Sequence, residues 1–328
     1  MLGLLLTLSA CGGSDDNPSE ATQLNEPETR AALALDSKQC SVITSGTPVA
    51  NGHREVVVSA GTFTMGSDRH YREERPQREV YVPEFTIDVH EVTNRQFAEF
   101  VRQTGYITTA EKIPLAVDNP GIPAQFLVAG SAVFVSPADG KAGHWTDWWQ
   151  FVPGTSWKNP EGPGSDIAGR ENHPVVHVSY LDAKAYAQWA GRSLPVEAQW
   201  ERAAKALGDS LAANTWQGVF PLQNRSLDGF AGTAPVGCFA ANDLGIHDMI
   251  GNVWEWVDDP YSEAGPAAQE RVRTGSAAKA IKRVVKGGSY LCASNYCRRD
   301  RPQARQSQEE NFGSAHIGFR TVSQLPVD

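Results

Sequence analysis

Long stretches without hydrophobic periodicity are the strongest constraint on the fold of this 328-residue chain. Residues 107–178 and 208–328 lack the regular spacing of apolar residues that is typical of helices or strands, and they are rich in Gly, Pro, Trp and Asn. Loops of this length inside a compact domain are usually functional or are held in place by metal ions or disulfides. Because the chain also contains 30 glycines and nine tryptophans, we expect a loop-rich fold with tight turns and aromatic anchors.

Short strands are predicted near the start of the folded part. Residues 56–66 (VVVSAGTFTMG) predict two strands that meet at Ala60 and Gly61, and residues 79–93 predict a further strand region that is interrupted at Pro83. We find no internal repeat and no second domain boundary. The prediction is therefore one α+β domain.

Helices are predicted where capping signals precede an apolar face. Two of them begin at a Ser or Thr that can form a capping box with a polar residue three positions later, and both end at Gly. A third has Pro near its first position, where the missing N–H costs nothing. The expected helices run from Thr93 (with Gln96) to Gly105, from Ser179 (with Asp182) to Gly191, and from near Pro195 to about Leu207.

The first residues, MLGLLLTLSAC, resemble a bacterial lipoprotein signal: an apolar run, small residues, and then Cys11 as the lipidated residue. An ordinary signal peptide or an exposed N-terminal strand are the alternatives. Residues 12–45 are polar and without periodicity, which predicts a flexible tether to a domain over 46–328. We therefore expect an exported lipoprotein on the periplasmic face of a bacterial membrane, namely the outer membrane. No later stretch reaches the 18 apolar residues expected of a membrane span.

The composition is that of an ordinary globular protein, with 41% hydrophobic and 20% charged residues. A net charge of −9 argues against nucleic acid and against anionic membrane surfaces as partners. We expect a monomer.

A cysteine pair lies in residues 287–297 (GGSYLCASNYC), where Cys292 and Cys297 follow two glycines. A local disulfide, a metal or redox site, and coincidence are all open interpretations. The C-x₄-C spacing is wider than the C-x-x-C of thioredoxin-like motifs and lacks the second pair of a structural zinc site. Two thiolates are soft ligands that favour Cu(I) and leave coordination positions open. Gly287 and Gly288 let the backbone turn closely, which suits a site presented by a loop.

The remaining cysteines leave the pairing undecided. Disulfides persist in an exported protein. With Cys11 acylated, Cys40 and Cys238 could pair across the fold, which leaves Cys292 and Cys297 for each other or for a ligand. The number of cysteines alone does not decide between these possibilities.

Several stretches, taken in order, resemble the formylglycine-generating enzyme family, the sulfatase-modifying factors. They are VVVSAGTFTMGS, FTIDVHEVTNRQFAEFV, HPVVHVSYLDAKAYAQWAGRSLPVEAQWERAAK, GNVWEWVDD, KGGSYLCASNYC and GFR at 318–320. The resemblance covers roughly residues 50 to 325. Residues 157–180 and 214–237 resemble the formylglycine-generating branch more narrowly.

The resemblance implies a single C-type-lectin-like domain with little regular secondary structure, stabilised by calcium. It also implies a reaction in which O₂ oxidises a cysteine of a partner sulfatase, within a Cys-x-Pro-x-Arg segment, to Cα-formylglycine. Cu(I) would be held by Cys292 and Cys297, and a thiol reductant would be needed. A non-catalytic binding or assembly lipoprotein on the same scaffold is the alternative. A non-heme iron sulfoxide synthase is disfavoured, because none of the eight His lies in an H-x₃-H-x-E arrangement.

Some positions match the family's site and others depart from it. Ser289, Tyr296 and Arg305 match, and they are expected to act near the thiolates, with Arg305 stabilising negative charge. Ala293 stands where the family usually has His. Residues 298–301 (Arg-Arg-Asp-Arg) replace a usual Tyr-Arg-Tyr-Arg run, and His316 stands where Asn is common.

Calcium is expected at two places. In GNVWEW (251–256), Glu255 lies between two tryptophans, and a buried carboxylate there requires a cation or several hydrogen-bond donors. Carboxylates and backbone carbonyls are the hard oxygen ligands that Ca²⁺ accepts. The resemblance implies one site from Asp248, Glu255 and the carbonyls of Gly251 and Val253, and another from Asn214, Asp228 and the carbonyls of Thr215 and Phe230.

Residues 144–157 (HWTDWWQFVPGTSW) concentrate four tryptophans. These rings could form an exposed wall for a substrate peptide, or they could belong to the core of a loop-rich domain. The sequence favours the core slightly and leaves both interpretations open.

Overall fold

The computed structural model describes Cys40 and residues 46–117, 119, 121–205, 212–263 and 282–324. The expected signal peptide (1–11, with Cys11) and nearly all of the expected tether (12–45) lie outside the described residues, so both stay predictions. Cys40 forms a disulfide with Cys238, one of the pairings that the sequence left open.

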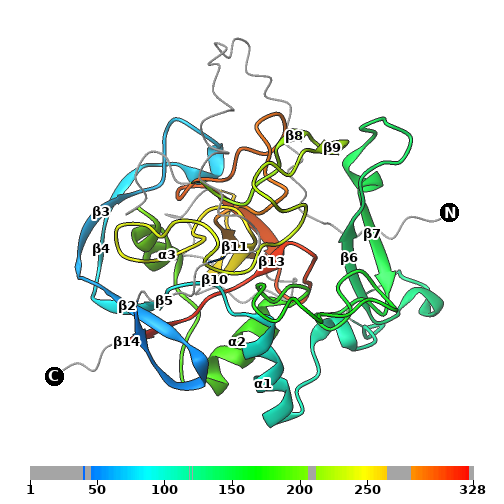
Figure 1. Ribbon diagram of the computed structural model, residues 1–328, viewed down its shortest axis with the longest axis horizontal. Coiled ribbons are helices and arrows are strands. Elements are labelled where there is room, and N and C mark those ends of the chain that lie inside the picture. Colours follow the sequence, from blue (N-terminus) through cyan, green and yellow to red (C-terminus); the bar gives the residue numbers. More distant parts are fainter. Residues whose placement is uncertain are drawn as a thin grey trace.

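The described residues form an α+β domain in which long loops connect short elements (Figure 1). The α-helices are α1 (Asn94–Thr104), α2 (Tyr180–Trp189) and α3 (Glu197–Ala204). The 3-10 helices are η2 (Ala50–Gly52), η3 (Arg72–Glu74), η4 (Thr109–Glu111), η5 (Ala124–Phe126) and η6 (Trp145–Asp147). The strands are β1 (Thr47–Pro48), β2 (Arg54–Val58), β3 (Gly61–Met65), β4 (Arg78–Val82), β5 (Phe85–Asp88), β6 (Gly130–Phe134), β7 (Trp149–Pro153), β8 (Gly218–Val219), β9 (Gln223–Asn224), β10 (Trp254–Pro260), β11 (Lys282–Lys286), β12 (Arg305–Glu309), β13 (Ile317–Gly318) and β14 (Val322–Gln324).

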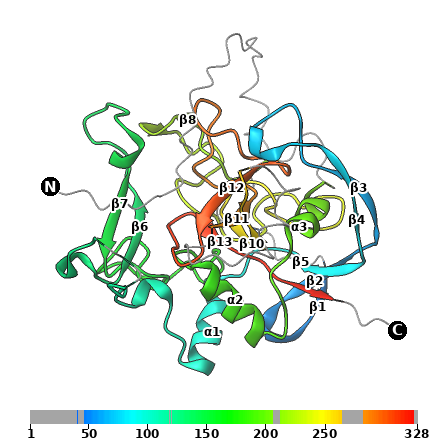
Figure 2. The same cartoon turned by 180° about the vertical axis from the view of Figure 1, so that it is seen from behind.

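A central sheet of order β12-β11-β10-β13 organises the domain. Strands β12, β11 and β10 pair antiparallel, and β13 joins β10 in parallel. A second sheet has the order β1-β2-β5-β14, and β3-β4, β6-β7 and β8-β9 form two-stranded sheets. Figures 1 and 2 show β3-β4 and β6-β7 on opposite sides of the central sheet. Within the described part, none of the helices combines the length and apolar character needed to cross a bilayer.

The structure confirms the predicted N-terminal strands and the first two helices. Strands β2 and β3 meet between Val58 and Gly61, and β4 and β5 flank Pro83. Helix α1 has the capping box of Thr93 and Gln96, and it ends at Gly105 in the left-handed conformation. Helix α2 has the capping box of Ser179.

Helix α3 differs in detail from its prediction. It begins at Glu197 after the N-cap Val196, two residues later than the expected start near Pro195. Its last residue is Ala204, and the expected end near Leu207 lies outside the described residues. Trp200 of α3 is fully buried against β10 and β11.

The expectation that 208–328 is irregular is wrong for the central sheet, whose strands all lie in this range. Their polar residues hide the periodicity. Lys286 of β11 and Arg305 of β12 are buried because both pair with Glu197, while Lys286 also pairs with Glu201. Buried ion pairs therefore replace apolar residues at core positions, which removes the alternation that predicts a strand.

Candidate active site

The two cysteines lie on a loop that follows β11 and is tied to two other loops. The Tyr290 N–H donates to the Asn252 carbonyl at 2.9 Å, and the Trp216 N–H donates to the Cys292 carbonyl at 2.9 Å. At the start of the loop, Gly288 has a φ of +77°, and a Cβ there would lie 2.9 Å from the Cys292 sulfur. The backbone therefore packs directly against this thiol, as a loop-borne site requires.

The sulfurs of Cys292 and Cys297 are 4.0 Å apart and each residue is 3% exposed. They are not bonded to each other, so the structure does not contain the local disulfide that the sequence left open. Cys292 is a free thiol. Burial, assisted by the charge of Asp300, raises its pKa to about 12, against a hydrogen bond from the Ser289 N–H at 3.5 Å. Metal binding at this sulfur must therefore displace a proton.

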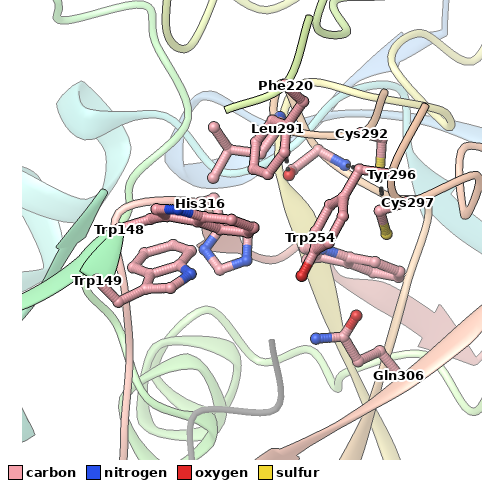
Figure 3. A pocket seen from close by; sticks show the side chains of 11 residues that line it. Trp148, Trp149, Phe220, Trp254, Leu291, Cys292, Tyr296, Cys297, Gln306 and His316 are labelled. Atoms are coloured by element: carbon pink, nitrogen blue, oxygen red, sulfur yellow. Dashed lines mark hydrogen bonds between the residues drawn. The ribbon is translucent and has the colours of Figure 1, made fainter. Parts of the chain in front are cut away.

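Aromatic rings surround the sulfurs in a small cavity of about 30 Å³, close to the space that one water occupies. The Tyr296 ring stacks on Phe220 with centroids 4.7 Å apart and meets Trp148 edge-on at 5.2 Å. Figure 3 shows these side chains around the pocket. The lining comprises Trp148, Trp149, Phe220, Trp254, Ser289, Leu291, Cys292, Tyr296, Cys297, Gln306 and His316.

Two tryptophans of this stretch, Trp148 and Trp157, are buried in hydrophobic clusters, as the interpretation that the sequence slightly favoured predicts. Trp157 is 3% exposed and belongs to the core around α1 and α2. Trp148 and Trp149, at the start of β7, line the pocket. The periodicity of the stretch did not distinguish them.

Ser289, Tyr296 and the two cysteines come together in this pocket, whereas Arg305 is not part of its described lining. The Arg305 guanidinium makes a bidentate ion pair with Glu197, at 2.9 and 3.1 Å. The guanidinium found near the sulfurs belongs to Arg299, whose Nη1 is 3.9 Å from the Cys297 sulfur and whose Nη2 donates to Glu73 at 2.6 Å. The expected contact of Arg305 with the thiolates is thus replaced by one from Arg299.

Ala293 and His316, two departures from the family pattern, both lie in the buried surroundings of the cysteine pair. Ala293 is 4% exposed and belongs to an aromatic cluster with Trp148 and Phe220, so this wall of the site is apolar. His316 lines the pocket, with its ring centroid 4.7 Å from that of Trp149. Burial and the nearby His177 lower the pKa of His316 to about 3.

Hydrogen bonds join three residues of the calcium site expected at Asn214, Asp228, Thr215 and Phe230. The Asp228 carboxylate accepts hydrogen bonds from the backbone N–H groups of Thr215, at 3.2 Å, and Phe230, at 3.0 Å. Burial raises the pKa of Asp228. The side-chain oxygen of Asn214 is buried and has no hydrogen-bond partner. A buried amide oxygen without a partner, on the residue next to the one whose N–H binds the Asp228 carboxylate, fits a cation of the calcium type.

At the calcium site expected from Asp248 and Glu255, the Glu255 carboxylate already has hydrogen-bond donors. The Arg320 guanidinium makes two hydrogen bonds of 2.7 Å to its carboxylate, and Trp200 Nε1 donates at 2.7 Å. The sequence requires a cation or several hydrogen-bond donors around Glu255. The structure supplies a cationic side chain, Arg320, and a further donor, Trp200, both from residues far away in the chain. Asp248 accepts from the Gly237 N–H at 2.7 Å.

Glu91 was missed by sequence reasoning, although it lies in the quoted motif FTIDVHEVTNRQFAEFV. Its carboxylate is fully buried, and one of its oxygens has no partner. Burial and the charges of Asp248 and Glu255 raise its pKa well above the ordinary value, against the effect of Arg320. Three buried carboxylates thus face one guanidinium, an excess of negative charge that a divalent cation would offset.

Among the described residues, no group of three or more His, Cys, Asp or Glu side chains has the arrangement of a metal site. The sites considered above are smaller sets: two cysteines, or one or two side chains with backbone carbonyls.

Comparisons with known proteins bear on the family and the fold of the chain. The family described as "Sulfatase-modifying factor enzyme 1-like domain" matches residues 43–325. The "Formylglycine-generating enzyme" of Mycobacterium tuberculosis is 47% identical over 292 residues, covering 82% of this chain and 97% of that protein. The "Inactive C-alpha-formylglycine-generating enzyme 2" of Mus musculus is 36% identical over 287 residues, covering 82% and 85%. The solved structure of PvdO from Pseudomonas aeruginosa has a TM-score of 0.57 at 22% identity, covering 87% of this chain and 100% of that one. This last likeness shows the fold alone.

Proposed function

Because this chain belongs to the sulfatase-modifying factor family, which includes formylglycine-generating enzymes, we propose that it converts a sulfatase cysteine within a Cys-x-Pro-x-Arg segment to Cα-formylglycine. The observation that carries the proposal is the buried pair Cys292 and Cys297, with sulfurs 4.0 Å apart in an aromatic pocket. In the proposed reaction, a CH₂SH group, O₂, two protons and two electrons give CHO, H₂S and H₂O. A thiol reductant supplies the electrons and becomes a disulfide.

Cys297 is disulfide-bonded in this structure, to a partner other than Cys292, so the cysteine pair would hold Cu(I) only after reduction leaves both residues as thiols. The distance of 4.0 Å is less than twice a metal–thiolate bond of about 2.3 Å, so one ion can contact both sulfurs. Both ligands are soft, as Cu(I) prefers. When bound, the ion would supply one-electron chemistry with O₂ and an affinity for a third thiolate, that of the substrate.

Neighbouring residues would stabilise the charged form of the two cysteines. The Ser289 N–H points at the Cys292 sulfur, where it favours the charged form. The Arg299 guanidinium lies beside Cys297 and offsets negative charge there. The rings of Trp148, Phe220 and Tyr296 pack against one another, so they exclude water and strengthen both electrostatic effects.

We propose that calcium holds the loops that carry this site. The unpaired oxygens of Asn214 and Glu91 and the raised pKa values of Asp228 and Asp248 support two cation sites. The two regions adjoin, because the Asn252 N–H donates to the Asn214 carbonyl at 2.9 Å. Both also contact the cysteine loop through the hydrogen bonds of Trp216 and Tyr290. Loss of calcium should therefore loosen the cysteine pair as well.

Export and lipid anchoring through Cys11 remain part of the proposal. The disulfide between Cys40 and Cys238 supports an oxidising compartment. The intact mass of protein extracted from membranes would carry a diacylglycerol-type modification at Cys11. An unmodified cysteine would contradict the anchor.

The test of the activity uses the full chain, loaded with Cu(I) and supplied with O₂ and a thiol reductant. A peptide containing Leu-Cys-Thr-Pro-Ser-Arg should show the mass loss that replacement of CH₂SH by CHO requires. Cys292→Ala and Cys297→Ala should each abolish tight Cu(I) binding and conversion while the chain stays folded. Ser294→Ala changes an exposed position on the same loop and should retain both. Tight copper binding by the double alanine variant would refute the site.

A non-catalytic binding lipoprotein is the second candidate, and the apolar environment of Ala293 favours it. An unaltered chain that binds copper but produces no aldehyde, while Ala293→His produces it, would identify a relative that has lost catalysis. Failure of both forms to bind copper would favour the binding role.

A further inference from the structure

A second cavity lies beside the loop that joins β3 to β4. Its volume is about 330 Å³, against about 30 Å³ around the two cysteine sulfurs. Sites for small molecules begin at about 300 Å³, so this cavity has room for one. The described side chains of its lining are those of Ser67, Arg69, His70, Gln77, Lys205 and Gln303.

Segments from distant parts of the chain build this cavity. Residues 66–77 lie between β3 and β4, Lys205 directly follows α3, and Gln303 lies shortly before β12. In Figures 1 and 2, β3 and β4 lie on the opposite side of the central sheet from β7, whose Trp149 lines the cysteine pocket. The described linings of the two cavities share no residue. The second cavity is therefore separate from the site of the proposed oxidation.

Hydrogen bonds hold the wall that residues 66–77 form. The Gly66 N–H donates to the Glu201 carboxylate at 2.7 Å, and the Ser67 N–H donates to the Glu74 carbonyl at 3.2 Å. Gly66 has a φ of +80°, and a Cβ there would lie 2.5 Å from the Glu74 carbonyl oxygen. Only glycine fits this position, so the shape of the cavity follows from close backbone packing.

The lining is rich in hydrogen-bond donors and positive charge. Arg and Lys side chains carry donors only, while Ser and Gln can donate or accept. The described lining contains no carboxylate. The carboxylates nearby are paired with other cations, since Glu201 accepts from Lys286 at 3.0 Å and Glu74 accepts from Arg301 at 2.6 Å. The cavity therefore presents positive charge to a ligand.

Lys205 is the least exposed cation of the described lining. It is half-buried, and its Nζ donates to the Thr64 carbonyl. Among the hydrogen bonds and ion pairs of the described residues, none joins the side chain of Lys205 or Arg69 to a carboxylate. A half-buried cation without a carboxylate partner favours an anion beside it.

Further cations act on the same place through His70. Burial lowers the pKa of His70, and the guanidinium groups of Arg301, Arg298 and Arg69 lower it further, against the opposite effect of Glu74. The ring is therefore mostly neutral at neutral pH, where it can offer an N–H donor. The guanidinium groups around it supply a positive potential that attracts an anion.

We propose that this cavity binds the phosphate or sulfate group of a small organic ester, with Lys205 and Arg69 as the charged donors. A tetrahedral oxyanion presents several acceptor oxygens, which match an ammonium group and the guanidinium fork. Gln77 and Gln303 line the space that remains for hydroxyl groups of the same molecule. The proposal depends neither on the cysteine pair nor on the reaction proposed above.

Isothermal titration calorimetry of the full chain, in a chloride buffer without phosphate or sulfate, measures this binding. The probes are glycerol phosphate and glycerol sulfate, and glycerol is the uncharged control. We expect at least one ester to bind and glycerol not to bind. The comparison of the two esters identifies the oxyanion that the site prefers.

Substitutions of the two cations locate the anion on the chain. Lys205→Gln removes the charge but keeps a donor for the Thr64 carbonyl. It should weaken binding of the preferred ester about tenfold, as loss of a charged hydrogen bond predicts. Arg69→Gln, at an exposed position, should weaken it about threefold. Arg102→Gln is the matched control, because this exposed guanidinium pairs with Glu99 outside the cavity, and it should leave Kd unchanged.

Failure of both esters to bind at millimolar concentrations would overturn the proposal. Glycerol that binds as tightly as the esters would also overturn it, since the charge would then play no part. An unchanged Kd in both Lys205→Gln and Arg69→Gln would place the anion elsewhere, and an equal loss in Arg102→Gln would reduce the effect to surface charge. If Lys205→Gln does not fold, the comparison of Arg69→Gln with Arg102→Gln decides. The titration uses neither copper nor a sulfatase peptide, so its outcome is independent of the proposed oxidation.

Discussion

Replacing Gly288 with alanine tests how closely the cysteine loop packs around the Cys292 sulfur. The residue has a φ of +77°, and an added Cβ would lie 2.9 Å from that sulfur and 3.1 Å from both the Arg299 carbonyl oxygen and the Asp300 Cα. The left-handed conformation costs alanine about 1 kcal/mol. Overpacking against the sulfur and backbone adds about 1–3 kcal/mol. We expect Gly288→Ala to lower the free energy of unfolding by about 2–4 kcal/mol.

Gly105→Ala provides the matched control. Gly105 follows α1 with a φ of +66°, and a Cβ there would meet nothing within 4 Å. This variant should show only the conformational cost of about 1 kcal/mol. Urea unfolding of the metal-free protein at one pH measures both losses. Competition with a Cu(I) chelator should show affinity lowered about tenfold or more in Gly288→Ala, because the thiol must move, and unchanged affinity in Gly105→Ala.

Equal losses of stability in the two variants would refute the close packing of the loop against Cys292. Unchanged Cu(I) affinity in Gly288→Ala would separate the packing from the metal site and refute the assignment of Cys292 as a ligand.

The remaining predictions concern the buried charges. Excess calcium chelator should lower the melting temperature, since cations that bind only the folded state stabilise it by mass action; an unchanged value would contradict structural calcium. Arg320→Met leaves Glu255 buried without its guanidinium and should cost about 3–5 kcal/mol in urea unfolding, whereas Arg102→Met, at an exposed pair, should leave the midpoint nearly unchanged. Burial raises the pKa of Asp88, but His53, Arg192 and Thr321 outweigh it and hold the pKa below its ordinary value. The stability that Asp88 contributes is therefore present above about pH 4 and lost as pH falls further; Asp88→Asn should flatten this acid decline, and an unchanged decline would contradict the assignment.

Elements with local signals could be predicted from the sequence. The capping boxes at Thr93 and Ser179 depend on residues three positions apart, and the turns at Gly105 and Pro83 depend on single residues. Such signals depend on residues within about one turn of backbone, so the predicted helix ends do not depend on how the rest of the chain packs. The central sheet had no comparable signal, because its buried Lys286 and Arg305 resemble surface residues until Glu197 is brought beside them.

The residues of the candidate site also fall into two groups, those close together in the sequence and those that only the fold brings together. Ser289, Cys292, Tyr296 and Cys297 belong to one loop, so their proximity was visible in the sequence and the family resemblance. His316 and the tryptophans of β7 reach the pocket from distant segments. Arg305 and Arg299 could not be distinguished by sequence, since both follow the cysteines closely and only one lies beside a sulfur.

The amino-acid sequence by itself therefore determined the family, the capped helices, the short strands and a loop with two neighbouring cysteines. The tertiary structure decided which buried charges pair, namely Glu255 with Arg320 and Glu197 with Arg305. It also decided that Glu91 keeps an unpaired oxygen, and that the neighbouring sulfurs stay 4.0 Å apart. The physical reason is that the energy of a buried charge depends on its distance through space to its partners and on its loss of water. Neither quantity exists for the chain until segments that are far apart in sequence have packed together.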